Sequence, residues 1–306
     1  MSDSPSIPFA AREAILAWYA VNGRRLAFRE TSDPYAILVS EAMAQQTQAS
    51  RAADHWRRFV VRFPTVAALA GSSYADVQRA WQGLGYNRRA LALWRAARVI
   101  QNEHGGRVPD SVELLETLPG VGSYTARAVA AIAFGRPVGA VDVNVRRVLG
   151  RILGRDHDAL PKRQMQAIAD DAVPPGMAAK WTHAVMDVGA TLCRPREPRC
   201  EECPARQWCR YATARGAEAD HPAKASTTKR DSTPAFASTN RWLRGRILDR
   251  LRAVADDGWL TMDAAIGLHD ADRVRAAASA MAREGLIEFD VEAREGGLIR
   301  ARLATR

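Results

Sequence analysis

All four cysteines of the chain lie in one short segment. They are Cys193, Cys200, Cys203 and Cys209, so the gaps between them are six, two and five residues. Four thiolates this close together form a soft-ligand site that suits zinc or an iron–sulfur cluster. In a chain without a secretory signal, such clustering favours metal binding over disulfides. On spacing alone zinc stays an alternative, because Cys-x2-Cys pairs are common in zinc sites.

A glutamate on the apolar face of a predicted helix is a candidate for acid–base chemistry. The helix is expected to open at Asp33 and to continue through Gln48. Glu41 lies four residues after Ile37 and three after Leu38, so it shares their face. A carboxyl group there is desolvated, which raises its pKa and favours its acid form. The alternative is a structural ion pair with one of the many arginines.

A glycine-containing turn is a candidate phosphate site. The segment 118–125 reads Leu-Pro-Gly-Val-Gly-Ser-Tyr-Thr and precedes a predicted apolar helix at 126–134. Gly120 and Gly122 around Val121 allow a sharp turn with exposed amides, which meet the N-terminus of the next helix. The alternative is an ordinary helix–helix turn, because Gly-x-Gly alone is a weak signal.

An aspartate precedes another predicted helix. The apolar run that starts at Pro137 ends at Asp142, and the following residues have helical periodicity. The apolar positions of that helix are Val145, Val148, Leu149 and Ile152. Taken alone, the position of Asp142 is typical of a helix N-cap.

Together these segments resemble one family. The hairpin at 118–122, the Val-Asp-x-Asn-Val-Arg-Arg segment at 141–147 and the four-cysteine tail occur in this order in the endonuclease III superfamily of DNA glycosylases. Further segments are similar to its adenine glycosylase branch, MutY. They are the Ser-Glu-x-Met-x-Gln-Gln-Thr-Gln helix at 40–48, the Gly-Leu-Gly-Tyr turn at 83–86 and Met-Asp-x-Gly-Ala at 186–190. The resemblance covers about residues 8–210.

The resemblance implies a mainly α, two-lobed fold with a helix–hairpin–helix, and a 4Fe–4S cluster on the four cysteines. It also implies that the base is taken out of the stack and cleaved from its sugar. Glu41 would then protonate adenine, and an ionised Asp142 would stabilise the oxocarbenium-like sugar. Lyase members carry a lysine just after the hairpin, where this chain has Tyr124. We therefore expect a monofunctional hydrolase in base excision repair.

The resemblance also assigns contacts with mismatched double-stranded DNA. The hairpin amides would hold a backbone phosphate, and the segment after Glu41 would enter the duplex near the extruded base. The residues assigned to DNA or base binding are Gln45, Gln46, Thr47, Tyr86, Gly120, Val121, Gly122, Asn144 and His183.

Four residues depart from the pattern of the branch near the base pocket. Ala44 stands where a wedging Leu is usual, and Asn87 stands where a second aromatic is common. Phe28 replaces the Trp of a Leu-x-Trp-Arg segment, and His183 occupies a Gln- or Glu-like position that faces the adenine edge. These departures bear on which base is chosen, not on which bond is cleaved.

Charge and composition divide the chain into three parts. The 306 residues carry a net charge of +10, which suggests a polyanionic partner. The excess of Lys and Arg over acids is eight in residues 1–210 and one in residues 240–306. We expect a glycosylase domain at 1–210, a linker at 211–239 and a small winged-helix-like domain at 240–306. This last part has helices at 241–254 and 271–284 and strands at 286–291 and 298–303, and replaces the usual Nudix-like domain.

Three functions fit these residues. The first is an adenine glycosylase acting on adenine opposite 8-oxoguanine or guanine. The second is a thymine or uracil mismatch glycosylase, and the third is a non-catalytic iron–sulfur DNA-binding regulator. Glu41 with Asp142 argues against the third, and the Gln-Gln-Thr segment favours the first. No apolar run approaches the roughly 18 residues of a membrane-spanning helix, so we expect the protein in the cytoplasm, associated with the nucleoid. We also expect a monomer.

Overall fold

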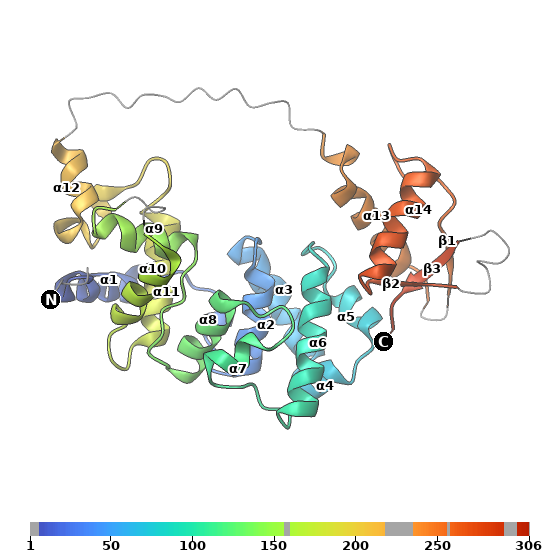
Figure 1. The fold of residues 1–306 in the computed structure, drawn as a ribbon, viewed down its shortest axis with the longest axis horizontal. Helices are drawn as coiled ribbons and strands as arrows, with labels where there is room; N and C mark the ends of the chain where they lie inside the picture. Colours follow the sequence, from blue (N-terminus) through green and yellow to red (C-terminus); the bar gives the residue numbers. More distant parts are fainter. Residues whose placement is uncertain (1–5, 156–159, 218–234, 256–257, 291–298, 306) are drawn as a thin grey trace. The chain divides into compact units, whose positions relative to one another are not determined.

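The protein is mainly helical, as predicted, with a small sheet near its C-terminus (Figure 1). This computed structural model describes residues 6–155, 160–217, 235–255, 258–290 and 299–305. The chain divides into two compact units, Met1–Glu41 with Val108–Ala225, and Ala42–Arg107 with Ser226–Arg306. The chain therefore passes from the first unit to the second directly after Glu41, inside one helix.

The first unit packs its helices around a central one, α11. Its elements are α1 (Phe9–Asn22), η1 (Ala27–Arg29), the part of α2 (Pro34–Ala44) that ends at Glu41, α7 (Val112–Glu116), α8 (Ser123–Phe134), α9 (Val143–Ile152), α10 (Lys162–Asp171), α11 (Ala178–Thr191), η2 (Cys200–Glu202), η3 (Arg206–Trp208) and α12 (Arg210–Ala217). Helix α11 contacts α1, α8 and α9. The predicted apolar stripe of α9 is buried in this core, which is the main stabilising contribution to such packing.

The second unit joins two separated stretches of the chain. Its elements are α3 (Ala49–Arg62), α4 (Val66–Ala70), α5 (Tyr74–Ala80), α6 (Arg88–Glu103), η4 (Phe236–Ser238), α13 (Asn240–Arg252), β1 (Leu260–Thr261), α14 (Ala271–Arg283), β2 (Ile287–Phe289) and β3 (Arg300–Leu303). Thr65 and Ser73 begin α4 and α5 by accepting hydrogen bonds from backbone amides. The apolar side of α6, with Leu91, Trp94 and Ile100, is buried.

The C-terminal segment, residues 235–305, has the helix pair and hairpin expected of a winged helix. Helices α13 and α14 pack together, and the antiparallel sheet has the order β1-β3-β2. Ile287 pairs with Leu303 and Leu260 pairs with Ala301. The short strand β1 was not predicted, and the predicted strand ends at 291 and 298 lie outside the described residues. Helix α12 extends to Ala217, into the segment predicted as a linker.

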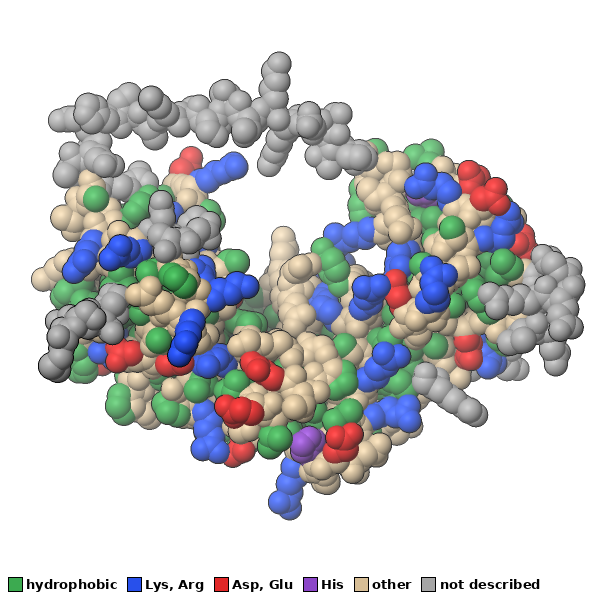
Figure 2. Space-filling view, in the orientation of Figure 1, with side chains coloured by type: hydrophobic (Ala, Val, Ile, Leu, Met, Phe, Trp, Pro, Cys, Tyr) green, Lys and Arg blue, Asp and Glu red, His purple; other side chains and the backbone are tan. Residues whose placement is uncertain are grey.

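Polar contacts fix this segment to α5 and α6 within the second unit. The buried Gln78 donates to the carbonyl oxygen of Leu286 at 2.6 Å. Glu284 accepts hydrogen bonds from Arg88 and Arg244, which lower its pKa to about 2. In Figure 2 many basic side chains lie over α5, α6 and α13. None of the described helices has the length and apolar character needed to cross a membrane.

Candidate active site

Glu41 is a buried carboxyl with acid character. It lies on α2, whose first turn is capped by Asp33, which accepts hydrogen bonds from the amides of Tyr35 and Ala36 at 3.2 Å. Burial raises the pKa of Glu41 to about 7, against the lowering effects of a hydrogen bond from Tyr124 and the charge of Arg29. The alternative of a structural ion pair is not what the structure has, because the Arg29 guanidinium is paired with Asp187.

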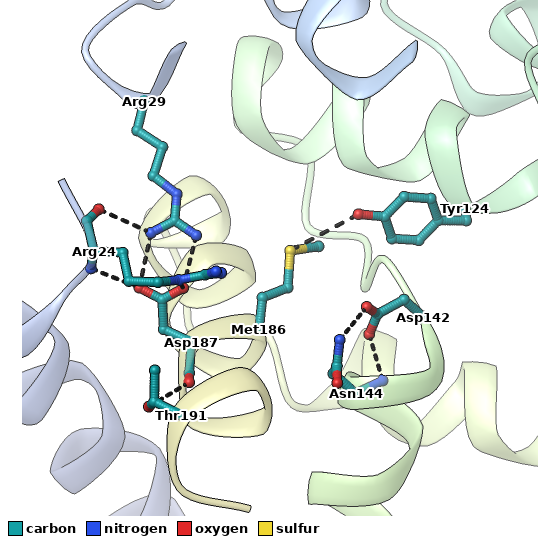
Figure 3. A network of polar contacts seen from close by, with 8 residues as sticks. All are labelled: Arg24, Arg29, Tyr124, Asp142, Asn144, Met186, Asp187 and Thr191. Atoms are coloured by element: carbon teal, nitrogen blue, oxygen red, sulfur yellow. Dashed lines mark hydrogen bonds and ion pairs between the residues drawn. The ribbon is translucent and has the colours of Figure 1, made fainter. Parts of the chain in front are cut away.

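Tyr124 lies beside Glu41 in the first turn of α8. Burial and the nearby charges of Glu41 and Asp142 raise the pKa of Tyr124 well above its usual value. Its hydroxyl therefore stays neutral, and it lies 3.8 Å from the Met186 sulfur (Figure 3). A neutral phenol can donate a hydrogen bond but offers no amine for a covalent sugar adduct.

Asp142 is both a helix cap and a fixed carboxylate. Its Oδ1 accepts hydrogen bonds from the amides of Asn144 at 2.8 Å and Val145 at 2.7 Å, at the start of α9. Its Oδ2 accepts one from the side chain of Asn144 at 2.9 Å (Figure 3). These three N–H donors hold the Asp142 carboxyl group in one orientation. The N-cap interpretation is confirmed, and it also supplies the orientation that a charge-stabilising role needs.

Arginine contacts connect Asn144 to the segment that contains the cysteines. Arg147 donates to the Asn144 side chain at 2.7 Å and to the backbone oxygens of Gly189 at 2.7 Å and Cys193 at 2.6 Å. A Cβ at Gly189 would lie 2.7 Å from the Asn144 Cβ, so only glycine allows α11 and α9 to approach this closely. These contacts fix the orientation of the amide that binds Asp142.

A buried ion-pair cluster borders the same region and was missed from the sequence. Asp187 is fully buried and accepts hydrogen bonds from Arg24 Nε at 2.6 Å and from both terminal nitrogens of Arg29 at 2.8 Å (Figure 3). Burial alone would raise the pKa of Asp187, but the two guanidinium groups lower it below its usual value. Asp187 belongs to the Met-Asp-x-Gly-Ala segment at 186–190, which resembled the family pattern, but the sequence did not indicate a role for this aspartate.

His183 is neutral in the folded protein. Burial lowers its pKa to about 3, and the charge of Arg29 lowers it further. Its ring centroid lies 6.4 Å from that of Tyr19 on α1. An uncharged imidazole offers one donor and one acceptor, as does the amide of a Gln at this position.

Only one glycine of the hairpin needs a glycine backbone. Gly120 has φ +76°, whereas Gly122 has an ordinary extended conformation, with φ −93° and ψ 176°. The expectation that both glycines turn the chain was therefore wrong for Gly122, which is the N-cap residue of α8. A Cβ at Gly122 would meet nothing within 4 Å. The space around Gly122, next to the first-turn amides of α8, is therefore open. The neighbouring Val121 is buried.

Four of the residues assigned to DNA or base binding, Gln45, Gln46, Thr47 and Tyr86, lie on two loops of the second unit. Helix α2 ends at Ala44, not at Gln48 as predicted, and Gln46 has φ +52°. The reason is Arg89, which donates to the backbone oxygens of Ala42, Met43 and Gln45 at 2.9, 2.9 and 2.6 Å. These bonds occupy the last carbonyl groups of the helix and turn the chain away.

Arg89 also holds the second loop, at 83–87. Its other terminal nitrogen lies 3.2 Å from the Thr47 hydroxyl, 3.3 Å from the Leu84 oxygen and 3.4 Å from the Gly85 oxygen. Burial lowers the pKa of Arg89, and the charge of Arg241 lowers it further. Sequence reasoning missed Arg89, because most of its contacts are to backbone oxygens, three of them more than 40 residues away, and such contacts leave no side-chain pattern.

Tyr86 is presented by this loop as an exposed aromatic ring. It has φ +46° and is 40% exposed. The guanidinium carbons of Arg89 and Arg241 lie 5.3 and 4.3 Å from its ring centroid. The next residue, Asn87, accepts a hydrogen bond from Arg252 at 2.8 Å. One residue that departs from the family pattern thus binds the C-terminal segment.

The structure brings the four cysteines near one another, and three of them, Cys193, Cys203 and Cys209, belong to or pack against the core of the first unit. Burial raises the pKa of Cys203 to about 11, and the other three thiols are close enough to contribute. Among the residues that the structure describes, no three Cys, His, Asp or Glu side chains are arranged as ligands of a metal ion. Four neighbouring thiols are nevertheless the donor type and number that zinc and iron–sulfur clusters use.

Comparison with known proteins agrees with this arrangement. The family described as HhH-GPD superfamily base excision DNA repair protein matches residues 39–175. The adenine DNA glycosylase of Mycobacterium tuberculosis is 43% identical over 261 residues, which cover 81% of this chain and 83% of that protein. This share exceeds what residues 1–210 could supply, so the similarity continues into the C-terminal third.

Solved structures give the same result for the fold. A thermostable thymine-DNA glycosylase has a TM-score of 0.63 and 32% identity, covering 66% of this chain and 95% of that one. Endonuclease III in a non-covalent DNA complex has a TM-score of 0.58 and 21% identity, covering 67% of this chain and 95% of that one, and supports the fold alone. The chain therefore belongs to the adenine DNA glycosylases, within the HhH-GPD superfamily of base excision DNA repair proteins.

Proposed function

We propose that this protein hydrolyses the N-glycosidic bond of adenine mispaired with 8-oxoguanine or guanine in double-stranded DNA. The observation that carries the proposal is the contrast between two neighbouring carboxyl groups. Glu41 has a pKa of about 7 because it is buried, whereas Asp142 is held by three N–H donors. One acid and one anion in different surroundings are what cleavage of a glycosidic bond requires.

Glu41 acts as the general acid. Adenine is a poor leaving group until a ring nitrogen is protonated, and a carboxyl group with a pKa near neutrality can supply that proton at physiological pH. Tyr124 is placed to orient the Glu41 carboxyl group by a hydrogen bond. The base reaches this group after it leaves the stack.

Asp142 stabilises the positive charge that develops on the sugar. Its fixed orientation means that no reorganisation is needed as the bond breaks. Water completes the reaction, because Tyr124 occupies the place of the lyase lysine, and Lys162 and Lys180 are exposed on the surface of the first unit. The product is therefore an abasic strand that stays intact until alkali or heat cleaves it, and borohydride should trap little enzyme on DNA.

DNA is held by the hairpin and by the two loops of the second unit. The hairpin at Gly120–Gly122 binds a backbone phosphate through the first-turn amides of α8. The duplex near the extruded base is contacted by Gln45, Gln46, Thr47 and Tyr86. The base pocket contains Asn144 and His183, which bind DNA or the base. The acting form is a monomer.

The four cysteines hold a 4Fe–4S cluster in this proposal. The supporting observation is that the four cysteine side chains lie near one another, with Arg151 Nη1 3.4 Å from the Cys193 sulfur. Such a cluster would anchor the segment 193–209 in the folded protein. Purified protein should be brown and contain four iron and four sulfide per chain, and a colourless protein with one zinc would contradict the assignment.

A panel of duplexes tests the reaction. Single-turnover release of adenine, thymine and uracil is measured opposite guanine and 8-oxoguanine. We expect fast release of adenine opposite 8-oxoguanine, slower release of adenine opposite guanine, and no release of thymine or uracil. The thymine-DNA glycosylase with a similar fold makes thymine or uracil release the second candidate, and preferential release of either pyrimidine would replace the adenine assignment.

A further inference from the structure

The ring of Tyr86 lies beside two arginines and no described acid. Arg89 comes from the same loop region, but Arg241 comes from α13 in the C-terminal segment. Arg241 is exposed and forms no ion pair with any residue that the structure describes. The charge of Arg241 also lowers the pKa of Arg89, so the two cations repel each other. Two uncompensated cations around an exposed aromatic ring suit a nucleic acid, with phosphates and stackable bases.

The position of Arg241 is fixed by the way the C-terminal segment is docked. Arg252, also on α13, donates to the Gln78 oxygen at 3.1 Å and to the Asn87 side chain at 2.8 Å. Glu284 joins Arg244 of α13 to Arg88 of α6. These contacts lie on both sides of Tyr86 in the sequence, so they place α13 against the loop that presents the ring.

We propose that Arg241 is a positioning residue for DNA recognition, which holds the ring of Tyr86 where it stacks on a base of the mismatched duplex. This inference rests on the proposed function, because it requires duplex DNA as the ligand. The C-terminal segment would then contribute to DNA recognition through one side chain, Arg241.

The backbone of Tyr86 explains why a support is needed. A residue other than glycine at φ +46° is strained, by on the order of 1 kcal/mol, and relaxes unless its surroundings hold it. Arg89 fixes the carbonyl groups before Tyr86, whereas Arg241 contacts the ring itself. Without Arg241 the loop would keep its backbone anchor but lose the orientation of the ring.

Binding measurements on the full chain test the proposal. All variants carry Glu41→Gln, so that a duplex with adenine opposite 8-oxoguanine stays uncut. We expect Tyr86→Ala to weaken binding roughly tenfold, as loss of one stacked base would. Arg241→Ala should weaken it about threefold, the size of an exposed cation–π contact. The double variant should bind no more weakly than Tyr86→Ala, and Arg241→Lys should restore binding.

Arg250→Ala is the matched control. Arg250 is an exposed arginine on the same helix, nine residues further and so on the opposite side, and its loss changes the net charge equally. It should change affinity less than twofold. Circular dichroism spectra of all variants should match the parent.

Two results would overturn the proposal. Equal effects of Arg241→Ala and Arg250→Ala would remove any specific role. Multiplicative effects of Arg241→Ala and Tyr86→Ala, with a salt slope reduced by about one, would make Arg241 an independent phosphate contact. If the native protein binds the duplex but releases no adenine, the proposed function fails while these binding results still decide the role of Arg241.

Discussion

Each unit contains a charged side chain that several groups contact, Asp187 in the first and the half-buried Arg89 in the second, but the two charges are balanced differently. Asp187 in the first unit is paired with Arg24 and Arg29, so its charge is compensated within the protein. Arg89 in the second unit donates to backbone oxygens and a hydroxyl, and no carboxylate among the described residues pairs with it. The charge of Asp187 is thus neutralised by neighbouring arginines, whereas Arg89 keeps a positive charge that no described carboxylate neutralises.

This difference separates the tasks of the two units. The carboxyl groups with acid–base potential, Glu41 and Asp142, both belong to the first unit. The loops assigned to the duplex, and the arginines that hold them, belong to the second. We therefore expect substitutions at the carboxyl groups and the Asp187 cluster of the first unit to affect base release or stability, and substitutions in the two loops of the second unit to affect DNA binding.

The largest expected effect is the loss of base release in Glu41→Gln. The amide keeps the shape of the side chain but cannot donate a proton from a carboxyl group, and general acid catalysis contributes roughly thousandfold. Single-turnover release of adenine should fall by about that factor, while duplex affinity changes little. Glu13→Gln, an exposed glutamate on α1, is the control. Near-normal release by Glu41→Gln would remove Glu41 from its assigned role.

The second effect is on stability. Asp187→Asn leaves the Arg24 and Arg29 guanidinium groups without their carboxylate, and breaking a buried ion pair costs about 3 kcal/mol or more. Urea denaturation should show this loss of unfolding free energy. Asp54→Asn, at an exposed ion pair with Arg57, should change stability by less than about 1 kcal/mol. Equal stability of the two variants would mean that the Asp187 cluster is not structural.

The third prediction concerns Arg89 of the second unit, whose charge is not paired with any described carboxylate. Arg89→Met keeps the apolar stem but removes the hydrogen bonds to the two loops. Hydrogen bonds to a charged group contribute about 2 kcal/mol, so duplex binding should weaken roughly thirtyfold. The rate of base release at saturating enzyme should change far less. A large fall in that rate, with unchanged affinity, would reverse the division of tasks.

The smallest effect is the pH dependence of release. Glu41 must be protonated to act as the acid, and its pKa is raised to about 7. The group therefore carries its proton below this value and loses it as the pH rises. Single-turnover release from prebound duplex should fall about tenfold between pH 6 and pH 8. A rate that stays flat or rises across this range would exclude Glu41 as the titrating acid.

The sequence predicted the groups whose local pattern carries information. Glu41 follows apolar residues at helical spacing, and Asp142 stands at a helix start, so their burial and capping followed from the chain itself. Arg89 could not be found this way, because carbonyl oxygens are present at every residue and give no partner pattern. The early end of α2 at Ala44 depends on the same long-range contacts.

The docking of the C-terminal segment was also beyond local reasoning. Its two helices and two of its strands followed from periodicity, with α13 at Asn240–Arg252 and α14 at Ala271–Arg283. Its attachment to α5 and α6 depends on Gln78, Asn87 and Glu284 finding partners far along the chain. Such pairs are recognisable only once the fold brings them together.

The hydrogen bond between Asn87 and Arg252 joins the loop at 83–87 to the C-terminal segment, so each depends on a side chain of the other. The family commonly carries an aromatic residue where this chain has Asn87, and an aromatic ring could not accept that hydrogen bond from the guanidinium group. Recombination that exchanged the C-terminal segment alone would leave one of the two residues without its partner.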